Sequence, residues 1–308
     1  MKIAILGATS QIAKDLIEAF AKKTDYECTL FARNPSIVIE WLKKVNIQQL
    51  YQALDYSYFN TDHHYDVILN FVGVGNPAQA QEMGSKIFDV TYKYDMMALD
   101  YLKVHSETKY IFLSSGAVYG GNFEQPVTSE SVAVIPINNL NVTDWYAIAK
   151  LYAEARHRAL PELSIVDIRV FNYFSHTQDM NARYFITDIV RAIRDNTILI
   201  SSVDYIVRDF LHPSDFYQLI YVLIFWGGAN TAIDCYSLMP IDKPRLLAAM
   251  KEMFELRYEV TETFDSVGAT GHKPYYYSLN THAAYFGYKP TLTSLEGLTR
   301  EIKFILEK

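Results

Sequence analysis

Residues 1–13 read MKIAILGATSQIA, and the fold class can be predicted from this segment. The apolar run Ile3–Leu6 predicts a buried strand, and Gly7 can make the tight turn that follows it. The next residues predict a helix, because the apolar side chains of Ile12 and Leu16 would lie on one face. A strand, a glycine turn and a helix in this order predict the first unit of a doubly wound α/β fold. The apolar run is too short for a signal peptide.

Short apolar runs alternate with helical stretches through the first two-thirds of the chain, as expected for the βαβ units and parallel sheet of a Rossmann-type fold. Further strands are predicted at Cys28–Ala32, Val45–Leu50, Asp66–Val72, Tyr110–Leu113 and Leu163–Phe171. Helices are predicted at Ile37–Leu42, Gln79–His105 and Asp144–Leu160, and then near Tyr184–Arg194, Asp215–Trp226, Lys243–Phe254 and Ser294–Glu307.

The change in regularity after the last of these strands indicates two domains. We expect residues 1–172, completed by about 214–238, to form a dinucleotide-binding domain. Residues 173–213 and 239–308 would form a smaller α/β substrate-binding domain folded against the sheet. No charged linker or low-complexity tract separates them, so the smaller domain is not expected to be an independent module.

Charge and composition exclude several classes of protein. The 308 residues carry a formal net charge of −7, which argues against a nucleic-acid-binding surface. The apolar run Leu219–Trp226 is well short of the roughly 20 residues that a membrane span needs. Cys28 and Cys235 lie far apart in apolar runs and lack metal-ligand spacing. We therefore expect buried thiols, no metal site and a soluble cytoplasmic protein.

The turn after the first strand is a candidate phosphate-binding turn. A dinucleotide pyrophosphate binds backbone N–H groups at a helix N-terminus and needs small residues nearby. Gly7 and Ala13 meet that need, whereas Ser10 stands where a glycine would allow the closest approach. A turn with one glycine is common in α/β proteins, so alone it leaves cofactor binding open. The candidate cofactor contacts are Gly7, Thr9, Ser10, Gln11, Ile12, Phe71 and Val72.

The end of the second strand bears on which cofactor is bound. A site for NAD usually places an acidic residue there, to accept a hydrogen bond from the ribose 2′-hydroxyl. Residues Leu30–Pro35 contain no acidic residue, and Arg33 could instead hold a 2′-phosphate with its planar fork of donors. These two features favour NADP, and NAD stays possible.

Tyr146 and Lys150 would lie one turn apart on one face of a helix. A cation beside a phenol favours its ionised form, and such a phenol can exchange a proton with a carbonyl oxygen. The same spacing recurs at Tyr285–Lys289, so spacing alone has little weight in a chain with 24 tyrosines. That second copy contains Gly287 and precedes Pro290, which disfavour a helix. The first copy follows the strand signals of the nucleotide-binding half, and this position favours it.

A carbonyl that is being reduced also needs a second hydrogen-bond donor. Ser115 lies in the small-residue segment Ser114–Gly120, directly after the predicted strand Tyr110–Leu113. It would therefore stand at the carboxyl edge of the sheet, where doubly wound folds bind ligands. A plain turn of small residues is the alternative interpretation. If Tyr146 and Lys150 are functional residues, a functional Ser115 is favoured over a plain turn.

Together these residues resemble the extended short-chain dehydrogenase/reductase superfamily, specifically the NAD(P)-dependent epimerase/dehydratase family that acts on nucleotide sugars. Besides the glycine turn, the matching segments are Asp66–Val72, Leu113–Gly120, Tyr146–Lys150, Arg169–Asn172, Arg208–Asp215 and Gly287–Pro290. The resemblance implies a catalytic Ser, Tyr and Lys, matched by Ser115, Tyr146 and Lys150. It also implies that Asn172 contacts the substrate and that Arg208 binds the nucleotide diphosphate.

The departures from the family pattern narrow the expected chemistry. The family's sugar 4,6-dehydratases place Asp-Glu directly after the catalytic hydroxyl residue, whereas this chain has Gly116-Ala117. The leading hypothesis is therefore a ketoreductase acting on a nucleotide-linked sugar. In it Tyr146 donates the proton, Ser115 polarises the ketone, and Lys150 positions the ribose and lowers the pKa of the phenol. The alternatives are an epimerase with bound NAD(P) and a non-catalytic NADP sensor of the same fold.

The resemblance also implies how two copies of the chain could associate. Family members often form homodimers through a bundle of two helices from each copy, which correspond here to Gln79–His105 and Asp144–Leu160. A nucleotide-sugar-like small molecule is the other expected partner, with no nucleic acid and no membrane.

Overall fold

The computed structural model describes residues 1–308 apart from 75–79, 81, 122, 229, 263–272 and 308. Its centre is a seven-stranded parallel sheet with the strand order β11-β6-β5-β4-β1-β2-β3. The strands are β1 (Lys2–Leu6), β2 (Glu27–Phe31), β3 (Gln52–Leu54), β4 (Val67–Asn70), β5 (Lys109–Ser115), β6 (Ile165–Val170) and β11 (Asn230–Asp234). The chain reverses its direction across the sheet between β1 and β4, and in doubly wound folds ligands bind at the carboxyl ends of the strands beside such a reversal.

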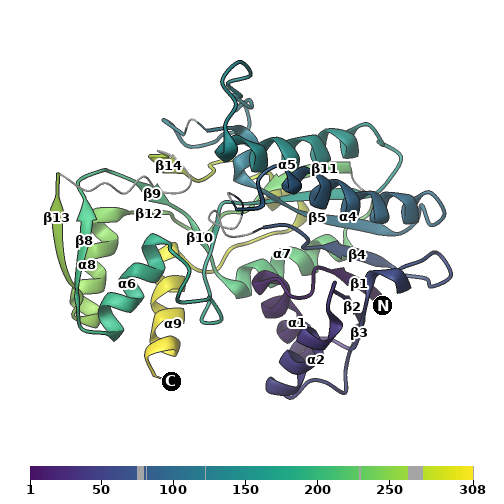
Figure 1. The fold of residues 1–308 in the computed structure, drawn as a ribbon, viewed down its shortest axis with the longest axis horizontal. Coiled ribbons are helices and arrows are strands. Elements are labelled where there is room, and N and C mark those ends of the chain that lie inside the picture. The colour runs from purple at the N-terminus through teal and green to yellow at the C-terminus, as the bar shows by residue number, and fades with distance from the viewer. Residues whose placement is uncertain (75–79, 81, 122, 229, 263–272, 308) are drawn as a thin grey trace.

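Helices cover both faces of this sheet (Figure 1). They are α1 (Gln11–Lys23), α2 (Pro35–Lys44), α4 (Lys86–Leu102), α5 (Val142–Arg158) and α7 (Pro213–Phe225). Side chains alternate between the two faces of a strand: Ile3 and Ile5 pack into the core beneath α1 and α7, and Ala4 and Leu6 into the core beneath α4 and α5. The predicted Rossmann-type α/β fold is thus confirmed.

A smaller group of elements lies beside the carboxyl edge of the sheet (Figure 1). Its short strands pair as β7 (Asn172–Tyr173) with β10 (Phe210–Leu211), β9 (Val207–Arg208) with β12 (Ile241–Asp242) and β14 (Tyr275–Tyr276), and β8 (Ile198–Ser202) with β13 (Arg257–Thr261). Its helices are α6 (Phe185–Arg194), α8 (Lys243–Phe254) and α9 (Ser294–Leu306), and they share a separate apolar core. Three short 3₁₀ helices complete the described elements: η1 (Tyr56–Tyr58), η2 (Gly116–Tyr119) and η3 (His282–Phe286).

The structure corrects the predicted third strand. Val45–Leu50 forms no strand, because α2 ends at Lys44 and β3 begins only at Gln52. Asn46 has a φ of 59°, and the N–H of Ile47 donates to the carbonyl of Leu42. This is the hydrogen-bond pattern of a Schellman helix end, which commonly brings an apolar contact with it. The apolar residues of this segment belong to the end of α2. In the sequence such a short apolar run cannot be told from a buried strand.

The predicted helix Gln79–His105 is shorter in the structure, where α4 covers Lys86–Leu102. Gly84 has a φ of 54°, and this left-handed conformation interrupts the helical backbone just before α4. Residues 79 and 81 of the predicted helix lie outside the described residues. Among the helices that the structure describes, we find none that is both long and apolar enough to cross a bilayer.

Candidate functional site

The turn between β1 and α1 packs directly against the segment after β4. Gly7 has a φ of 79°, and a Cβ there would lie 2.8 Å from the backbone of both Phe71 and Val72. Its N–H lies 3.0 Å from the carbonyl oxygen of Phe31 and 3.0 Å from the hydroxyl of Tyr56. Only glycine fits this combination of positive φ and close approach.

The N-terminus of α1 is open towards the carboxyl edge of the sheet. Ser10 is the N-cap residue, but its side chain makes no capping hydrogen bond, and the first turn holds no acidic residue. The first N–H groups of a helix and its dipole favour a bound anion under these conditions. Thr9 is exposed, and Ser10, Gln11 and Ile12 are half-buried. The amide of Gln11 donates to the hydroxyl of Ser175 at 2.9 Å, which joins this turn to the chain after β7.

Arg33 follows β2 at the same edge and is exposed. In the described part of the chain no carboxylate lies within ion-pair distance of its guanidinium. The neighbouring Asn34 is occupied as the N-cap of α2, where its side chain accepts from the N–H of Ser36 at 3.1 Å. A cation is therefore free at the end of the strand where family members that bind NAD usually place an acid.

Lys150 is buried, with 2 % of its surface exposed. Its Nζ donates to the carbonyl oxygen of Leu113 at 2.7 Å and lies 4.3 Å from the ring centre of Phe112. Burial lowers the pKa of this ammonium to about 8, although Asp95 and other carboxylates act against the shift. A Cβ on Gly73 would lie 3.3 Å from Nζ, so the chain after β4 passes directly over the lysine.

The hydroxyls of Ser115, Tyr146 and Tyr276 meet at the carboxyl end of β5. The Oγ of Ser115 lies 3.4 Å from the hydroxyl of Tyr276 and accepts from the N–H of Ala117 at 3.1 Å. Burial raises the pKa of Tyr146, and a hydrogen bond with the Ser115 side chain offsets part of this rise. Burial also raises the pKa of Tyr276.

The relation between Tyr146 and Lys150 differs from the one predicted. Both side chains come from α5, but the ammonium turns towards Leu113 on β5. It therefore does not lower the pKa of the Tyr146 phenol, which burial raises instead. The prediction that Lys150 lowers the pKa of the Tyr146 phenol is therefore wrong. The ammonium of Lys150 donates its hydrogen bond to the backbone of β5 and not to the phenol.

Two cations stand beside the hydroxyl cluster. One Nη of Arg208 donates to the carbonyl oxygens of Val207 and Lys273 at 2.8 and 2.7 Å, and the guanidinium lies 6.0 Å from the ring centre of Tyr276. The Nζ of Lys273 lies 4.8 Å from the same ring. Burial lowers the pKa of Arg208 to about 10. Burial, and then the charge of Arg208, lower the pKa of Lys273 to about 8.

No carboxylate forms an ion pair with either of these cations among the described residues. Burying two unpaired like charges is costly unless an anion is bound between or beside them. The arrangement therefore suits an anionic ligand.

Asn172 holds the strands of this region together. Its amide nitrogen donates to the carbonyl oxygens of Asp209 at 3.1 Å and Tyr276 at 3.4 Å. Asp209 follows Arg208 directly in the chain, and Tyr276 carries the third hydroxyl of the cluster. Its hydrogen bonds give Asn172 a positioning role, and its contact with a substrate stays a prediction.

Sequence reasoning missed three residues of this region: Tyr56, Tyr276 and Lys273. Each reaches the site from a segment without a recognisable motif, and their burial depends on contacts between distant parts of the chain. Tyr276 lies in a run of three tyrosines, which offers no signal for one in particular. The second Tyr-Lys pair, at Tyr285–Lys289, lies outside any α-helix: η3 ends at Phe286, and Gly287 has a φ of 92°.

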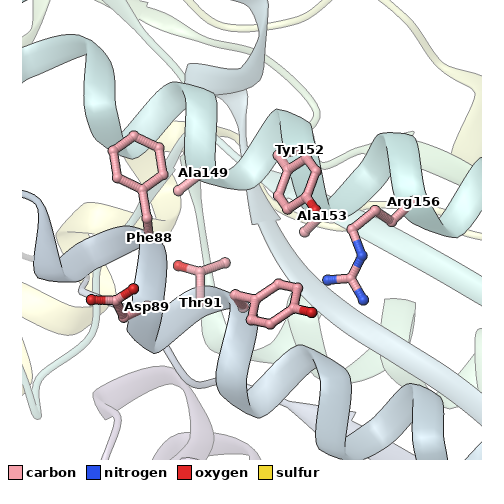
Figure 2. Close-up of a pocket in the computed structure, with 8 residues that line it drawn as sticks. Phe88, Asp89, Thr91, Ala149, Tyr152, Ala153 and Arg156 are labelled. Atoms are coloured by element: carbon pink, nitrogen blue, oxygen red, sulfur yellow. The ribbon is translucent and has the colours of Figure 1, made fainter.

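A separate hollow lies between α4 and α5, away from the hydroxyl cluster (Figure 2). The rings of Tyr92 and Tyr152 stack with their centres 6.5 Å apart, and both side chains are about half exposed. The guanidinium of Arg156 lies 4.8 Å from the first ring centre and 5.5 Å from the second. It also donates to the buried Asp95 at 3.0 Å. The remaining lining residues are Phe88, Asp89, Thr91, Ala149 and Ala153.

Solved structures with the same fold cover almost the whole chain. One is dTDP-glucose 4,6-dehydratase from Bacillus anthracis in complex with NAD, with 17 % identity, a TM-score of 0.78, and coverage of 100 % of this chain and 97 % of that one. Another is UDP-glucuronic acid 4-epimerase from Bacillus cereus in complex with UDP-glucuronic acid and NAD, with 16 % identity, a TM-score of 0.78, and coverage of 100 % and 99 %. A third is UDP-N-acetylglucosamine 4-epimerase from Methanobrevibacter ruminantium in complex with UDP-N-acetylmuramic acid, with 17 % identity, a TM-score of 0.81, and coverage of 99 % and 98 %.

At this identity the solved structures show the fold alone. No curated protein sequence matches the chain. The model of the NAD dependent epimerase/dehydratase family matches residues 3–233, which is three-quarters of the chain. The matched span contains the turn at Gly7 and the residues Ser115, Tyr146 and Lys150. The chain therefore belongs to the NAD-dependent epimerase/dehydratase family.

Proposed function

We propose that the protein reduces a keto group on a nucleotide-linked deoxysugar with NADPH. The observation that carries the proposal is the meeting of the Ser115 and Tyr146 hydroxyls beside the unpaired cations Arg208 and Lys273. The two hydroxyls can donate hydrogen bonds and a proton to a reacting carbonyl oxygen. The two cations can bind the negative charges of a nucleotide diphosphate.

The residues present fit a nicotinamide dinucleotide. The approach of Gly7 to the backbone of Phe71 leaves no room for a Cβ, and the helix N-terminus behind Ser10 has no side-chain cap. We infer that the pyrophosphate would be held by Thr9, Ser10, Gln11 and Ile12. The nicotinamide half of the cofactor would be contacted by Phe71, Val72 and Lys150. When bound, the cofactor supplies the hydride.

Tyr146 is the proposed proton donor. Because burial raises its pKa, the phenol stays protonated at neutral pH and can give its proton to the carbonyl oxygen. Ser115 donates a hydrogen bond to the same oxygen as negative charge develops on it. Lys150, whose ammonium binds the carbonyl oxygen of Leu113, is assigned to the cofactor ribose and takes no part in the proton transfer from Tyr146.

Arg208 and Lys273 are the proposed diphosphate contacts. Among the described residues only one Nη of Arg208 has hydrogen-bond partners, which leaves the rest of its fork for a ligand, and Lys273 adds a point charge. A bound diphosphate would relieve the repulsion between them and raise the pKa of Lys273 from its value of about 8.

The packing of Gly116 argues for reduction without loss of water. A Cβ at this position would lie 2.4 Å from the ring of Phe171, so a carboxylate side chain does not fit there without rearrangement. The next residue, Ala117, is buried as well. The acid and base that the family's 4,6-dehydratases carry after the catalytic hydroxyl have no counterpart at these two positions.

NADP is the proposed cofactor because Arg33 is exposed, unpaired within the described residues, and placed at the end of β2. A 2′-phosphate offers it three acceptor oxygens. In the Arg33→Ala variant the affinity for NADPH should fall by at least about tenfold, which corresponds to about 1.4 kcal/mol, while the affinity for NADH should change little. Equal losses for both cofactors would contradict this assignment. The matched control is Arg245→Ala on the exposed surface of α8.

The test of the reaction is the oxidation of NADPH in the presence of nucleotide-linked 4-keto-6-deoxysugars. Oxidation should occur in the wild type and be lost in Tyr146→Phe, whose affinity for NADPH should be unchanged. If the two proteins consume NADPH at the same rate, the role given to Tyr146 is wrong.

An epimerase that oxidises and reduces the same carbon is the second candidate. The family match favours it, and two of the similar solved structures are epimerases. Denaturing freshly purified protein and identifying the released nucleotide separates the two reactions. One retained NAD per chain would favour the epimerase, and a site that fills from added NADPH favours the reductase. A non-catalytic NADP sensor is a third possibility, and the loss of turnover in Tyr146→Phe would exclude it.

We also propose that two copies of the chain pair through α4 and α5. In a two-fold contact the rings of Tyr92 and Tyr152 would face the same rings of the second copy, and Tyr and Arg are enriched in such interfaces. Light scattering after gel filtration should give a dimer for the wild type and a monomer for Tyr152→Glu. The control Tyr58→Glu, at an equally exposed ring of η1, should remain a dimer.

A further inference from the structure

A cluster of two histidines and a glutamate lies at the amino edge of the sheet, opposite the candidate site. His64 comes from the chain before β4, and His105 and Glu107 from the turn between α4 and β5. One ligand atom from each side chain lies within 4.8 Å of the other two. The predicted absence of a metal site rested on cysteine spacing, and it could not anticipate a cluster formed by residues about 40 positions apart.

The two imidazoles turn the same ring nitrogen towards the same oxygen. The Nδ1 of His64 lies 3.7 Å, and the Nδ1 of His105 3.6 Å, from Oε1 of Glu107. These distances are too long for direct hydrogen bonds. They are close to the roughly 3.3 Å that separates two ligand atoms around a tetrahedral zinc with bonds of about 2.0–2.1 Å.

The opposite nitrogen of each imidazole is already bound. The Nε2 of His105 lies 2.9 Å from the carbonyl oxygen of Thr61, and the Nε2 of His64 lies 3.3 Å from a carboxylate oxygen of Asp66. Because a carbonyl and a carboxylate only accept, these contacts favour the neutral tautomer with the hydrogen on Nε2, which leaves a lone pair on Nδ1 for a metal ion. Histidines that bind metals have this arrangement almost always.

The surrounding hydrogen bonds hold the cluster in place. Asp66 also accepts from the backbone N–H of Lys2 at 2.7 Å, and the ring of His105 stacks on Tyr101 with the centres 4.5 Å apart. The hydroxyl of Tyr101 donates to the carbonyl oxygen of His63 at 2.8 Å, which ties the loop to α4. The two imidazoles are thus held in place before any ion binds, which reduces the cost of binding.

We propose that His64, His105 and Glu107 bind one divalent transition-metal ion, with zinc as the expected species. Two neutral imidazoles and one carboxylate suit zinc, and three protein ligands leave a fourth position for water. The site is distant from the proposed reaction and would join the loop before β4 to the end of α4. Its role would be to stabilise this edge of the sheet, since an ion that binds only the folded state stabilises it.

The test uses the full chain without an affinity tag, stripped with chelator and titrated with zinc chloride by calorimetry. The wild type should bind one zinc ion per chain, and His64→Ala and His105→Ala should each weaken binding by at least about tenfold. His63→Ala is the matched control, because that neighbouring imidazole faces Asn60 instead and should leave zinc binding unchanged.

Thermal unfolding gives a second measurement that does not depend on enzymatic activity. A zinc concentration about a hundredfold above the dissociation constant should raise the Tm of the wild type by roughly 5 °C and leave that of His64→Ala unchanged. His64 is half exposed, so its replacement should leave the chelated protein folded as before. The proposal is overturned if the wild type binds no more zinc than the His64→Ala/His105→Ala double variant, or if His63→Ala weakens binding equally.

Discussion

The Nδ1 of His157 lies 2.6 Å from a carboxylate oxygen of Asp167, and neither side chain is exposed. The other ring nitrogen lies 2.8 Å from the buried Asp95. Burial alone would lower the pKa of this imidazole, but the hydrogen bonds to Asp167 and Asp95 overcome that effect and raise it to about 9. A charged histidine thus holds two carboxylates in the core between the sheet and α5.

This histidine predicts a pH dependence of stability. Between the unfolded pKa of about 6.5 and the folded pKa of about 9, only the folded state binds the proton. Its contribution is therefore complete below about pH 6.5, and it falls by at most about 1.4 kcal/mol per pH unit up to about pH 9. The difference in the free energy of unfolding between wild type and His157→Gln should shrink over that range.

Urea unfolding at several pH values measures this difference, with His282→Gln on the surface as control. Should the histidine variant fold poorly, an NMR titration of the wild type provides the same test. Its buried imidazole should remain protonated up to about pH 9, and a proton lost near pH 6 would contradict the prediction.

Ser114 and Ser115 are adjacent but should respond differently to replacement by alanine. The hydroxyl of Ser115 meets Tyr146 and Tyr276, and losing such a donor to a developing oxyanion costs about 10²–10³ in kcat. The hydroxyl of Ser114 donates instead to the buried Glu154 at 2.5 Å. Its loss should reduce stability by about 1–3 kcal/mol and leave kcat nearly unchanged. Equal losses of kcat in the two variants would remove the case for Ser115.

Gly7→Ala should weaken both the fold and cofactor binding. The new Cβ would meet the backbone of Phe71 and Val72 at 2.8 Å in a conformation that L-residues rarely adopt. We expect a loss of roughly 1–3 kcal/mol in the free energy of unfolding, and a dissociation constant for NADPH raised by at least about tenfold. Gly227→Ala, where the Cβ meets nothing, should match the wild type in both measurements. NADPH affinity unchanged in Gly7→Ala would argue against this turn as the pyrophosphate site.

Lys273 predicts a pH dependence of nucleotide binding. Its pKa of about 8 in the free protein means that its charge, and with it part of the attraction for a diphosphate, is lost above pH 8. The affinity for UDP-glucose, whose diphosphate does not titrate in this range, should thus be constant below about pH 7 and weaken by at most about tenfold per pH unit above about pH 8. Lys273→Arg should remove this weakening, because arginine keeps its charge. The same pH profile in both proteins would assign the titration to another group.

The fold class and the main chemical groups could be predicted from the order of amino acids. Local periodicity identified the strands and helices of the large sheet, because each depends on residues within one segment. It failed at Val45–Leu50, where apolar residues close the end of α2 and form no strand. Ser115, Tyr146 and Lys150 could be selected because each stands beside a recognisable strand or helix, and their roles stay predictions.

The environment of these groups depends on how the chain packs and could not be predicted in the same way. It turned Lys150 towards Leu113, raised the pKa of Tyr146, and brought Tyr276 and Lys273 beside Ser115. It also assembled the cluster at His64 from separate segments. Burial and hydrogen bonding depend on which distant segments pack together, and pKa values follow from them. A sequence states which groups a chain has, and packing decides which of them meet and in which charge state.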